Sequence, residues 1–500
     1  MRLDAEIAVI GSGFGGSLTA LLLDRIGRRP MLVDRGSHPR FAIGESSTPI
    51  ANLVLRDLAL RYGLPRLVPL AKYGTWQATY PDVVCGIKRG FSYFQHVPGE
   101  PFAPQADHAN ELLVAASGDE QRSDTHWLRS DVDAFLVREV QAAGIPYFDR
   151  TDLTVLEHSP DWQLTGVRDG APLSIRAKFL VDATGEGGFL ERTLGFGSRV
   201  GELRTSSRGI FGHFTGLRPW HDALVAAGGR VEDHPFCCDH AALHQVLDEG
   251  WMWQLRFNNG VTSAGFALDA ARSPLDPQIP PEQEWNRLLR KYPAIAEQFA
   301  GARLVQPESG LRRSGRMQRL AGRIVGRNWA LLPHTAGFID PLHSTGIAHT
   351  MCGIERLIEI VAGQWEHSSL TDELRAYEQS VRRELALIDQ LVHGCYVCFG
   401  RFPLLVSFAM LYFAAATSYE HRRVKQQLRP GAAFLDADDP ALRAAVEQGT
   451  AMLRDCLPGA DGAAGFEQAI ARTIAPFNVA RLCDPGVRNM YRYTAVPDGP

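Results

Sequence analysis

A glycine-rich turn near the N-terminus constrains the fold of this chain more than any other feature. The turn reads Gly11-Ser12-Gly13-Phe14-Gly15-Gly16 and follows an apolar run at residues 6–10, which is typical of a buried parallel strand. Residues 17–26 show helical apolar spacing, and residues 30–34 read as the next strand. Together these segments predict a compact β-α-β unit of the dinucleotide-binding type.

Each glycine of the turn has a role in such a unit. Gly11 allows the tight turn, Gly13 lets the backbone approach a pyrophosphate, and Gly16 lets the helix pack close to the strand. The helix that begins near Phe14 presents free N–H groups to the phosphates. Asp34 ends the second strand, where a carboxylate accepts hydrogen bonds from the adenosine ribose. An acid at this position favours FAD or NAD over a 2′-phosphorylated nucleotide.

Two later segments favour FAD over NAD. In Val181-Asp182-Ala183-Thr184-Gly185 a strand ends in a turn of small residues, so the backbone around Asp182 can approach the cofactor a second time. The segment 337–346, which contains Asp340, ends another strand and opens a helix whose N–H groups can hold the flavin ring or a small anion. Three contact segments spread between residues 11 and 346 resemble FAD monooxygenase-type flavoproteins.

Hydrophobic patterning divides the chain into three predicted parts. The FAD-binding domain is expected to be discontinuous, at 1–185 and 321–370, because later strands of its sheet fall on both sides of another region. Residues 186–320 are expected to form a substrate-side sheet domain, and residues 371–500 a helical C-terminal region. The predicted fold class is α/β, with an FAD-binding Rossmann-like (GxGxxG) domain, a substrate-side β-sheet and a helical C-terminal region.

The individual elements follow from periodicity and turn residues. Asn258-Asn259-Gly260 is typical of a hairpin turn. A tail from Pro476, rich in Pro, Asn, Gly and Tyr, is expected to pack in an ordered way on the body. The predicted strands lie at residues 175–182, 209–217, 251–257, 262–268 and 328–332, and the predicted helices at 282–299, 346–361, 373–397 and much of 404–456.

Charge and hydropathy limit the partners of the chain. Lys and Arg total 52 against 56 Asp and Glu, and a nucleic-acid-binding surface usually shows as a basic excess, so we expect no nucleic acid partner. The longest apolar stretch, residues 403–417, is shorter than the ~18 residues of a membrane span. We expect a buried helix or a substrate-gate helix there and no membrane span, with membrane-surface contact as the alternative.

The cysteines and the N-terminus indicate a reducing location. The eight cysteines form no disulfide framework. Cys395 and Cys398 form a lone CxxC in a helical pattern without a second Cys or His pair at zinc spacing, so we read them as small apolar side chains and predict no metal site. Residues 1–6 run almost directly into a strand, without a signal peptide. We expect a cytoplasmic protein.

Further motifs make the resemblance specific. They are His38-Pro39-Arg40-Phe41, Gly44-Glu45-Ser46, Cys85-Gly86-Ile87-Lys88-Arg89-Gly90-Phe91-Ser92, Gly250-Trp251-Met252-Trp253, Phe257-Asn258-Asn259, Leu331-Leu332-Pro333, and the segment 337–342 with Ser344 and Gly346. With them the chain resembles flavin-dependent halogenases over nearly its whole length, and most of all the branch that acts on phenols.

That resemblance implies the cofactors and partners. FAD is used as FADH2, which a separate flavin reductase supplies, and O2 and chloride or bromide are consumed. The substrate is a small aromatic molecule, free or tethered to a carrier protein. We expect a monomer or a homodimer.

The resemblance also implies a catalytic lysine. In the family, reduced FAD, oxygen and a halide generate hypohalous acid, which crosses an internal tunnel to a lysine that Lys88 matches by its motif. The amine donates a hydrogen bond to hypohalous acid or forms a haloamine, and burial lowers its pKa and assists either role. A surface lysine beside Arg89 is the alternative.

A halide site is implied at the start of a helix. Thr345 and Gly346 match the positions whose backbone amides hold the halide near the flavin, although an ordinary helix cap can occupy the same place. The candidate catalytic residues His343 and Ser344 come directly before them. His343 replaces the glutamate that takes up the ring proton in tryptophan halogenases, and a histidine can act as a base near neutral pH. Phenol-type members also lack that glutamate, so free tryptophan is not the expected substrate.

Three matched residues are expected near the flavin. Arg40 belongs to the motif that follows the second strand. Glu45 positions the loop near the flavin or the tunnel, or is a structural loop acid. Arg129 matches an arginine near the flavin ring, and a helix-start salt bridge with Asp133 is the alternative.

The tunnel motif departs from the family pattern. Trp251 and Trp253 match the pair thought to line the tunnel and to keep substrate away from the flavin, but the following Ile-Pro is Leu255-Arg256 here. Arg256 is expected to reshape the tunnel or to bind an anionic group of the substrate, and it weakens the expectation of a halogenated product.

A second departure affects the cofactor site. Gly326-Arg327 lacks the family's ribityl-binding aspartate, a role for which Asp340 is the candidate.

Three other functions compete with halogenation. A single-component aromatic hydroxylase usually carries an Asp-Gly pair after its middle strand, where this chain has Asp182-Ala183. A reductase of the geranylgeranyl type shares the fold without the lysine. A flavin-binding protein without activity is favoured only by Leu255-Arg256.

Overall fold

The glycine turn forms the β-α-β unit that its sequence predicts. The computed structural model describes residues 1–456 and 463–492, and it begins with β1 (Arg2–Ile10), α1 (Phe14–Arg25) and β2 (Pro30–Val33). Gly11 has a φ of +104°, and a Cβ there would lie 2.6 Å from the carbonyl oxygen of Ala183. A Cβ on Gly16 would collide with the carbonyl oxygen of Gly11. Both positions therefore need glycine, the first for its left-handed backbone and the second for close packing of helix on strand.

The first sheet brings the carboxyl ends of five parallel strands to one edge. In spatial order its strands are β18 (Val325–Gly326), β19 (Trp329–Leu331), β10 (Ala171–Asp182), β1, β2 and β7 (Tyr147–Phe148), with β9 (Trp162–Arg168) and β8 (Thr151–Glu157) continuing from β10. β1 lies in parallel between β2 and β10, β19 pairs in parallel with β10, and β7 pairs in parallel with β2. Open α/β sheets bind their ligands at such an edge.

The second sheet is mainly antiparallel and includes the hairpin that Asn258-Asn259-Gly260 predicts. Its strands in spatial order are β15 (Arg303–Gln306), β11 (Ser207–Thr215), β14 (Val261–Asp269), β13 (Gly250–Arg256), β12 (Ala242–Val246), β4 (Gly90–Gln95), β5 (Glu111–Ala115) and β21 (Met490–Tyr491), with β16 (Arg312–Arg316) also on β11. β4 and β5 lie outside the predicted range of 186–320. They join this sheet because β4 pairs in parallel with β12, a long-range pairing that local sequence patterns do not reveal.

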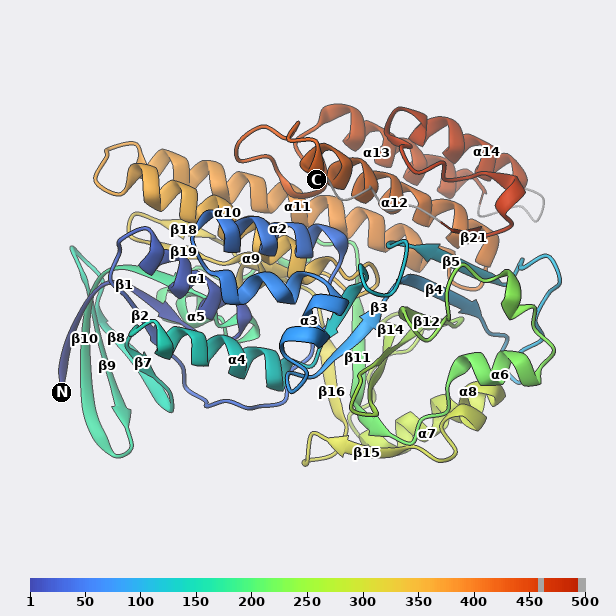
Figure 1. Cartoon of the computed structure of the whole chain (residues 1–500), viewed down its shortest axis with the longest axis horizontal. Helices are drawn as coiled ribbons and strands as arrows, with labels where there is room; N and C mark the ends of the chain where they lie inside the picture. The colour runs from blue at the N-terminus through green and yellow to red at the C-terminus, as the bar shows by residue number, and fades with distance from the viewer. Residues whose placement is uncertain (457–462, 493–500) are drawn as a thin grey trace.

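Long C-terminal helices run along one side of the molecule and extend over both sheets (Figure 1). They begin where the periodicity predicts them. The helices after α1 are α2 (Pro49–Arg61), α3 (Tyr73–Thr79), α4 (Arg129–Ala142), α5 (Phe189–Leu194), α6 (Trp220–Ala226), α7 (Pro281–Lys291), α8 (Pro293–Gln298), α9 (Pro333–Ala336), α10 (Thr345–Gln364), α11 (Leu370–Cys398), α12 (Phe402–Val424), α13 (Pro440–Cys456) and α14 (Ala463–Ile474).

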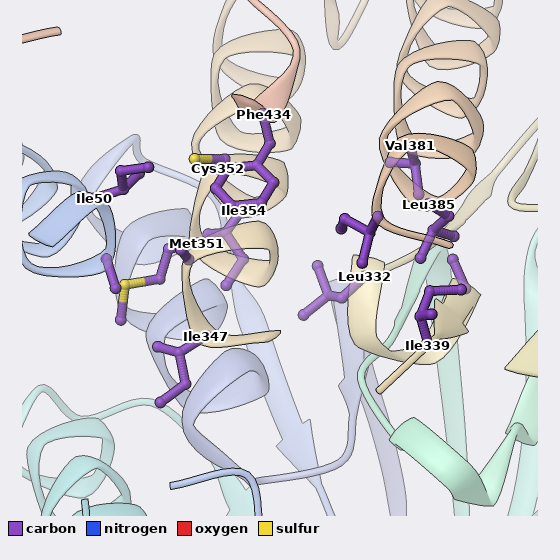
Figure 2. Packing of buried hydrophobic residues seen from close by; sticks show 14 of the residues in the cluster. Ile50, Leu332, Ile339, Ile347, Met351, Cys352, Ile354, Val381, Leu385 and Phe434 are labelled. Atoms are coloured by element: carbon purple, nitrogen blue, oxygen red, sulfur yellow. The ribbon is translucent and has the colours of Figure 1, made fainter. Parts of the chain in front are cut away.

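Helix α10 joins the FAD-side unit to the C-terminal helices. Figure 2 shows Ile347 and Met351 of α10 on the side of Ile50 from α2, whereas Val381 and Leu385 of α11 lie beside the segment before α10. All of these side chains belong to one buried cluster. Full burial of a side chain of this size contributes about 2 kcal/mol, so this contact holds the start of α10 in a fixed place.

Two predicted helical features differ from the structure. The helix expected at 282–299 divides into α7 and α8 at Tyr292, whose φ of −125° and ψ of 91° are extended. Pro293 causes the break, because a proline disfavours helical backbone in the residue before it. The helical pattern predicted over much of 404–456 divides into α12, which contains the apolar stretch at 403–417, and α13.

Helix α12 is buried along most of its length. Among the described residues it is the one helix long and apolar enough to cross a membrane, with a window of mean hydropathy 1.5, but 83% of that window is buried inside the protein. Such burial is usual for the core helix of a globular domain.

Cys395 and Cys398 on α11 are likewise buried, and burial raises the pKa of both thiols, so they pack as small apolar groups as predicted.

The C-terminal tail packs as predicted as far as the structure describes it. β21 pairs in parallel with β5, and Met490 and Tyr491 are both buried. The last part of the predicted tail, residues 493–500, lies outside the described residues.

The described residues also form two small sheets of two strands each. One pairs β3 (Cys85–Lys88) with β6 (Asp124–Trp127), and the other pairs β17 (Arg319–Leu320) with β20 (Gly337–Phe338).

Candidate active site

Asp34 holds the glycine turn from the end of β2. Its Oδ2 accepts hydrogen bonds from Ser12 N at 2.6 Å and from Arg40 Nη2 at 2.8 Å, and its Oδ1 accepts from Arg40 Nη1 at 2.7 Å. Burial alone raises the pKa of Asp34, but the bonds and charge of Arg40 and the N–H groups of Ser12 and Gly36 outweigh it and hold this pKa far below its usual range. The carboxylate is therefore ionised and fixed where a ribose would bind.

Arg129 lies across the glycine turn at the start of α4. Its guanidinium makes two hydrogen bonds to Asp133, at 3.0 and 2.8 Å, and lies 5.0 Å from the ring centroid of Phe14. Asp133 also accepts a hydrogen bond from Phe14 N at 3.1 Å. The salt bridge weighed as an alternative is thus present, and it places Arg129 beside the predicted pyrophosphate turn.

Two of the predicted cofactor carboxylates are engaged within the protein. Asp182 accepts hydrogen bonds from the backbone N–H groups of Thr184 at 2.9 Å and Leu190 at 2.7 Å. Asp340 accepts from Ser207 Oγ at 2.7 Å and Tyr396 Oη at 2.8 Å, and burial raises its pKa to about 6. Both residues therefore shape the backbone around the cofactor edge, and their role as direct cofactor ligands stays a prediction.

The edge of the first sheet fits a nucleotide cofactor. The cap residues of α1 and α10, Gly13 and Ser344, make no side-chain cap hydrogen bond. Asp133 takes the N–H of Phe14 at the start of α1, so the N–H groups that follow it, and those at the start of α10, are the ones that can face an anion. Gly346 is exposed at the start of α10, and a Cβ built there meets open space. Ser344, which precedes α10, has a φ of 52° and donates a hydrogen bond to Ser46 Oγ at 3.1 Å. The loop that carries Glu45 therefore lies against the predicted halide loop.

Glu45 connects the cofactor-side loop to the second sheet. Its Oε1 lies 2.8 Å from His213 Nε2 on β11, and both side chains are buried. The Phe41 ring packs 4.8 Å from the ring of His213. Glu45 thus makes a structural contact at the junction between the two sheets, and its role near the flavin or the tunnel stays a prediction.

Lys88 is completely buried, which excludes the alternative of a surface lysine. Its Nζ donates a hydrogen bond to Ser47 O at 2.6 Å and lies 4.2 Å from the ring centroid of Phe91. Asp124 faces it across the β3–β6 pair. Burial lowers the pKa of Lys88 to about 7, and the charge of Asp124 opposes that shift. A substantial fraction of the amine is therefore uncharged and nucleophilic near neutral pH.

The two tryptophans of the tunnel motif share one face of β13. Alternation along the strand places Trp251, Trp253 and Leu255 in the main core. Met252 faces the other way, into the core of the second sheet. Gly265 lies opposite Trp253 on β14 and leaves room for it, since a Cβ there would collide with the indole ring. Leu255 therefore keeps an apolar side chain on the tryptophan face.

Arg256 points to the opposite face and is fully engaged there. Its guanidinium donates hydrogen bonds to Asp239 Oδ1 at 2.7 Å, to Leu217 O at 3.1 Å and to Arg218 O at 2.6 Å. The strand alternation separates it from the tryptophan face. The predicted effect of Arg256 on the tunnel or on substrate binding therefore has no support in the geometry.

His343 is a weak base in its surroundings. Its ring stacks on Tyr412 of α12 at 4.2 Å between centroids, and its Nε2 faces Cys395 Sγ at 3.7 Å. Burial lowers the pKa of His343 to about 3, so the ring stays neutral and accepts a proton poorly at neutral pH. The geometry therefore disfavours the predicted role as a general base.

His244 is a residue of this site that sequence reasoning missed. Its ring lies between Tyr93 at 4.2 Å and Trp251 at 4.9 Å, and its nitrogens face Ser92 O at 3.1 Å and Leu342 O at 3.0 Å. Burial lowers its pKa to about 4. It therefore connects the strand after Lys88 to the halide loop. A lone histidine in a strand carries no sequence signal for this role, because its partners come from three distant segments.

Helix α12 packs against the same region. Tyr412 donates a hydrogen bond to His343 O at 2.9 Å, and the Phe413 ring lies 5.4 Å from that of Phe91. Phe91 in turn contacts the Lys88 amine. The apolar stretch thus packs against His343 and against Phe91, which contacts Lys88. Its role as a substrate-gate helix stays a prediction.

The fold and this edge define an FAD-binding flavoprotein. A family model described as tryptophan halogenase matches residues 125–401. Tetracycline 7-halogenase of Kitasatospora aureofaciens is 30% identical over 82% of this chain and 73% of its own length. Monodechloroaminopyrrolnitrin halogenase PrnC of Pseudomonas fluorescens is 28% identical over 87% of this chain and 77% of its own length.

A solved structure agrees with these sequence relatives. The crystal structure of halogenase PltM with phloroglucinol and FAD matches with a TM-score of 0.84 and 25% identity, over 97% of this chain and 99% of that one. The chain therefore belongs to the flavin-dependent halogenase family. Its cofactor is FAD, and the predicted resemblance and fold class are confirmed.

Proposed function

We propose that this halogenase passes hypohalous acid to Lys88 and uses it to halogenate an electron-rich, phenol-type aromatic substrate. The observation that carries the proposal is the complete burial of the Lys88 amine beside Phe91. Reduced FAD, when bound, supplies with O2 the oxidising power that converts chloride or bromide to hypohalous acid. Gly11, Gly13, Asp34 and the start of α1 would hold its nucleotide part, and the start of α10 its flavin end.

Residues of this chain bind the halide, line the path and react with the oxidant. Backbone N–H groups of Thr345 and Gly346 hold the halide. Trp251 and Trp253 line the path and separate the arene from the cofactor. The neutral Lys88 amine attacks the halogen of hypohalous acid, which gives a haloamine and water. The arene ring then takes the halogen, and its ring proton returns to the Lys88 nitrogen.

The state of His343 supports a phenolic substrate. A base with a pKa of about 3 gives little help in removing a ring proton, so the ring must be activated by its own substituent. A phenol hydroxyl provides that activation. The PltM structure that matches this chain holds phloroglucinol, which is a phenol.

The partners that complete the reaction are also proposed. A separate flavin reductase supplies FADH2, and the purified chain holds FAD weakly. A carrier-bound substrate is a second possibility, because one relative at 24% identity is a brominase of pyrrole carbonyl on a peptidyl-carrier protein. A cytoplasmic location fits the supply of reduced flavin.

The decisive experiment supplies FADH2, O2, chloride or bromide and a panel of phenols, with mass spectrometry of the products. We expect halogenated phenol in amounts that depend on halide. Hydroxylated product without halide dependence would instead establish an aromatic hydroxylase.

The pH profile of the same reaction tests the form in which Lys88 acts. A rate of product formation that rises with pH through about 7 indicates that the neutral Lys88 amine reacts, whereas a fall indicates that the ammonium form acts by donating a hydrogen bond.

Substitution of Lys88 tests the role of the amine. Lys88→Ala should abolish halogenation, because no other group receives the oxidant, while O2-dependent oxidation of FADH2 continues. Lys178→Ala, at an exposed position of β10, is the matched control and should leave both unchanged. Halogenation retained in Lys88→Ala would remove this lysine from the mechanism.

A further inference from the structure

Two histidines and a glutamate converge at the β5–β21 edge of the second sheet, outside the site described above. Glu111 begins β5, His108 precedes it by three residues, and His234 follows a turn in the segment before β12. Glu111 Oε2 lies 3.0 Å from His108 Nδ1 and 3.1 Å from His234 Nε2. The side chains are 4%, 2% and 3% exposed for His108, Glu111 and His234.

We propose that His108, Glu111 and His234 bind a zinc ion. All three ligand atoms lie within 4.8 Å of one another, so one ion can contact all of them. Zinc bonds to histidine nitrogen and carboxylate oxygen are about 2.0–2.2 Å long, which places two ligand atoms of a tetrahedral shell about 3.3 Å apart. The two nitrogen–oxygen distances are close to that spacing. Water completes the shell.

Asp233 contacts the ring nitrogen of His108 that would not bind the zinc ion, as carboxylates often do at zinc-binding histidines. Its Oδ2 lies 3.2 Å from Nε2 of His108, the nitrogen opposite the one that faces Glu111. A neutral imidazole carries one N–H, so without an ion it can donate to only one of the two carboxylates. With zinc on Nδ1, the proton rests on Nε2 and donates to Asp233. This is the carboxylate–histidine–zinc arrangement that fixes the ring and its tautomer.

The position of the cluster indicates a structural role for the ion. The ligands join the start of β5 to the segment around His234, which packs beside Phe94. The backbone of His108 also accepts a hydrogen bond from Asn489 Nδ2 at 3.1 Å, and Asn489 O accepts one from Leu113 N at 2.9 Å. Zinc would therefore join two segments that are far apart in sequence, and hydrogen bonds tie the first of them to Asn489, directly before β21.

The proposed site differs from the sequence prediction of no metal, which stays untested. That prediction depended on the lone CxxC and on zinc spacing between neighbouring pairs. His234 and Glu111 are separated by 123 positions, so only folding brings the ligands together. The inference is independent of the proposed halogenation mechanism.

The test measures zinc in the full-length protein, purified without a histidine tag and stripped with a chelator. Equilibrium dialysis against ZnCl2, with metal analysis by mass spectrometry, should give close to one zinc ion per chain. Zinc should also raise the melting temperature, because it binds only the folded state. No uptake above that of a metal-free control protein would overturn the proposal.

Variants locate the ion. His234→Ala should remove the bound zinc and the rise in melting temperature. Glu111→Gln keeps the size of the side chain and should lower zinc affinity at least tenfold in a protein whose circular dichroism is unchanged. His240→Ala removes a more exposed histidine–glutamate pair, to Glu120 at 3.1 Å, and should bind zinc as the parent does. Equal zinc uptake by the parent and both ligand variants would place the ion elsewhere.

Discussion

Lys88 and Lys178 carry the same side chain in opposite surroundings. Lys178 is exposed on β10, whereas Lys88 is completely buried between Ser47 O, Phe91 and Asp124. Burial removes water from the amine and so disfavours its charge. The local motif identified the residue, but its surroundings give it a nucleophilic form near neutral pH.

Replacement of His244 tests how the halide loop is held. His244→Phe keeps a ring between Tyr93 and Trp251 but loses the contacts to Ser92 O and Leu342 O. We expect kcat/KM for halogenation to fall about tenfold, as for one lost hydrogen bond, with FAD affinity unchanged. More H2O2 should be released per halogenated product, because hypohalous acid forms less efficiently when the loop is displaced.

His96→Phe is the matched control for that change. His96 is also buried, and its ring makes a hydrogen bond with Gln245 Oε1 at 2.7 Å, but it packs beside Trp220 away from the halide loop. The His96→Phe substitution should lower the free energy of unfolding without raising H2O2 release. Equal release from both variants would show that His244 is only a packing residue.

Secondary-structure elements decide which side chains face the site. The two-residue repeat of β13 turns Trp251, Trp253 and Leu255 to the main core and Arg256 away from it. The change from Ile-Pro to Leu-Arg is therefore mild on the tunnel side. In the same way α10 fixes the halide loop, because its first turn follows Ser344 and its body is packed between α2 and α11.

The packing of α10 on α11 includes a buried charge cluster that can be tested. Glu384 of α11 is fully buried and pairs with both Arg356 and His349 of α10. Glu384→Ala leaves Arg356 buried without this partner, so we expect the free energy of unfolding to fall by about 3–5 kcal/mol. Urea denaturation at pH 7 measures it. Glu359→Ala, which breaks the exposed pair with Arg61, should change it by less than about 1 kcal/mol.

The same cluster predicts a loss of stability in acid. Burial raises the pKa of Glu384, but Arg356 and His349 outweigh it and lower this pKa to about 2. A depressed carboxylate pKa stabilises the folded state above the unfolded value near 4.3, and this contribution disappears as the pH falls toward 2. The stability difference between the parent and Glu384→Ala should therefore shrink below pH 4. A constant difference from pH 7 to pH 2 would contradict the assignment.

The whole molecule places Lys88 where its two sheets meet. The β3–β6 pair lies between them, and Gly86 allows β3 to approach the backbone of Arg256, since a Cβ on Gly86 would collide with that carbonyl. The pair of Glu45 and His213 joins the same junction from the cofactor side. The junction therefore excludes water from the amine, which no single element could do.

Burial of Lys88 makes global stability depend on pH. The folded pKa is about 7 and the unfolded pKa is about 10.4, so between these values the unfolded chain binds the additional proton. The contribution of Lys88 to the free energy of unfolding therefore rises as the pH increases from 7 toward 10, and it changes little below pH 7. The free energy of unfolding of the parent should rise relative to Lys88→Met over pH 7–9 in urea denaturation.

Lys178→Met provides the control for this pH dependence. Water surrounds this side chain on the surface of β10, so its curve should run parallel to that of the parent. Parallel curves for Lys88→Met as well would mean that Lys88 is charged in the folded protein across this range.

Local signals predicted most of the fold. The glycine turn, four strands of the first sheet (β1, β2, β10 and β19), the hairpin of β13 and β14 and the long helices lie where periodicity and turn residues place them. The membership of β4 and β5 in the second sheet could not be predicted, because it depends on the pairing of Phe91 in β4 with Ala242 in β12, which lie far apart in sequence. Within the site, motifs identified Lys88, Trp251, Trp253 and the start of α10, but they did not reveal His244.

The sequence by itself determined the cofactor fold and the family, because glycine turns, strand periods and motif residues act through local backbone geometry. Only the tertiary structure decided the state of the individual side chains. It buried Lys88, turned Arg256 away from the tunnel face, made His343 a poor base and brought His108, Glu111 and His234 to one point. Burial and long-range contact set the pKa values and decide which distant side chains meet, and neither is encoded in any local stretch of the chain.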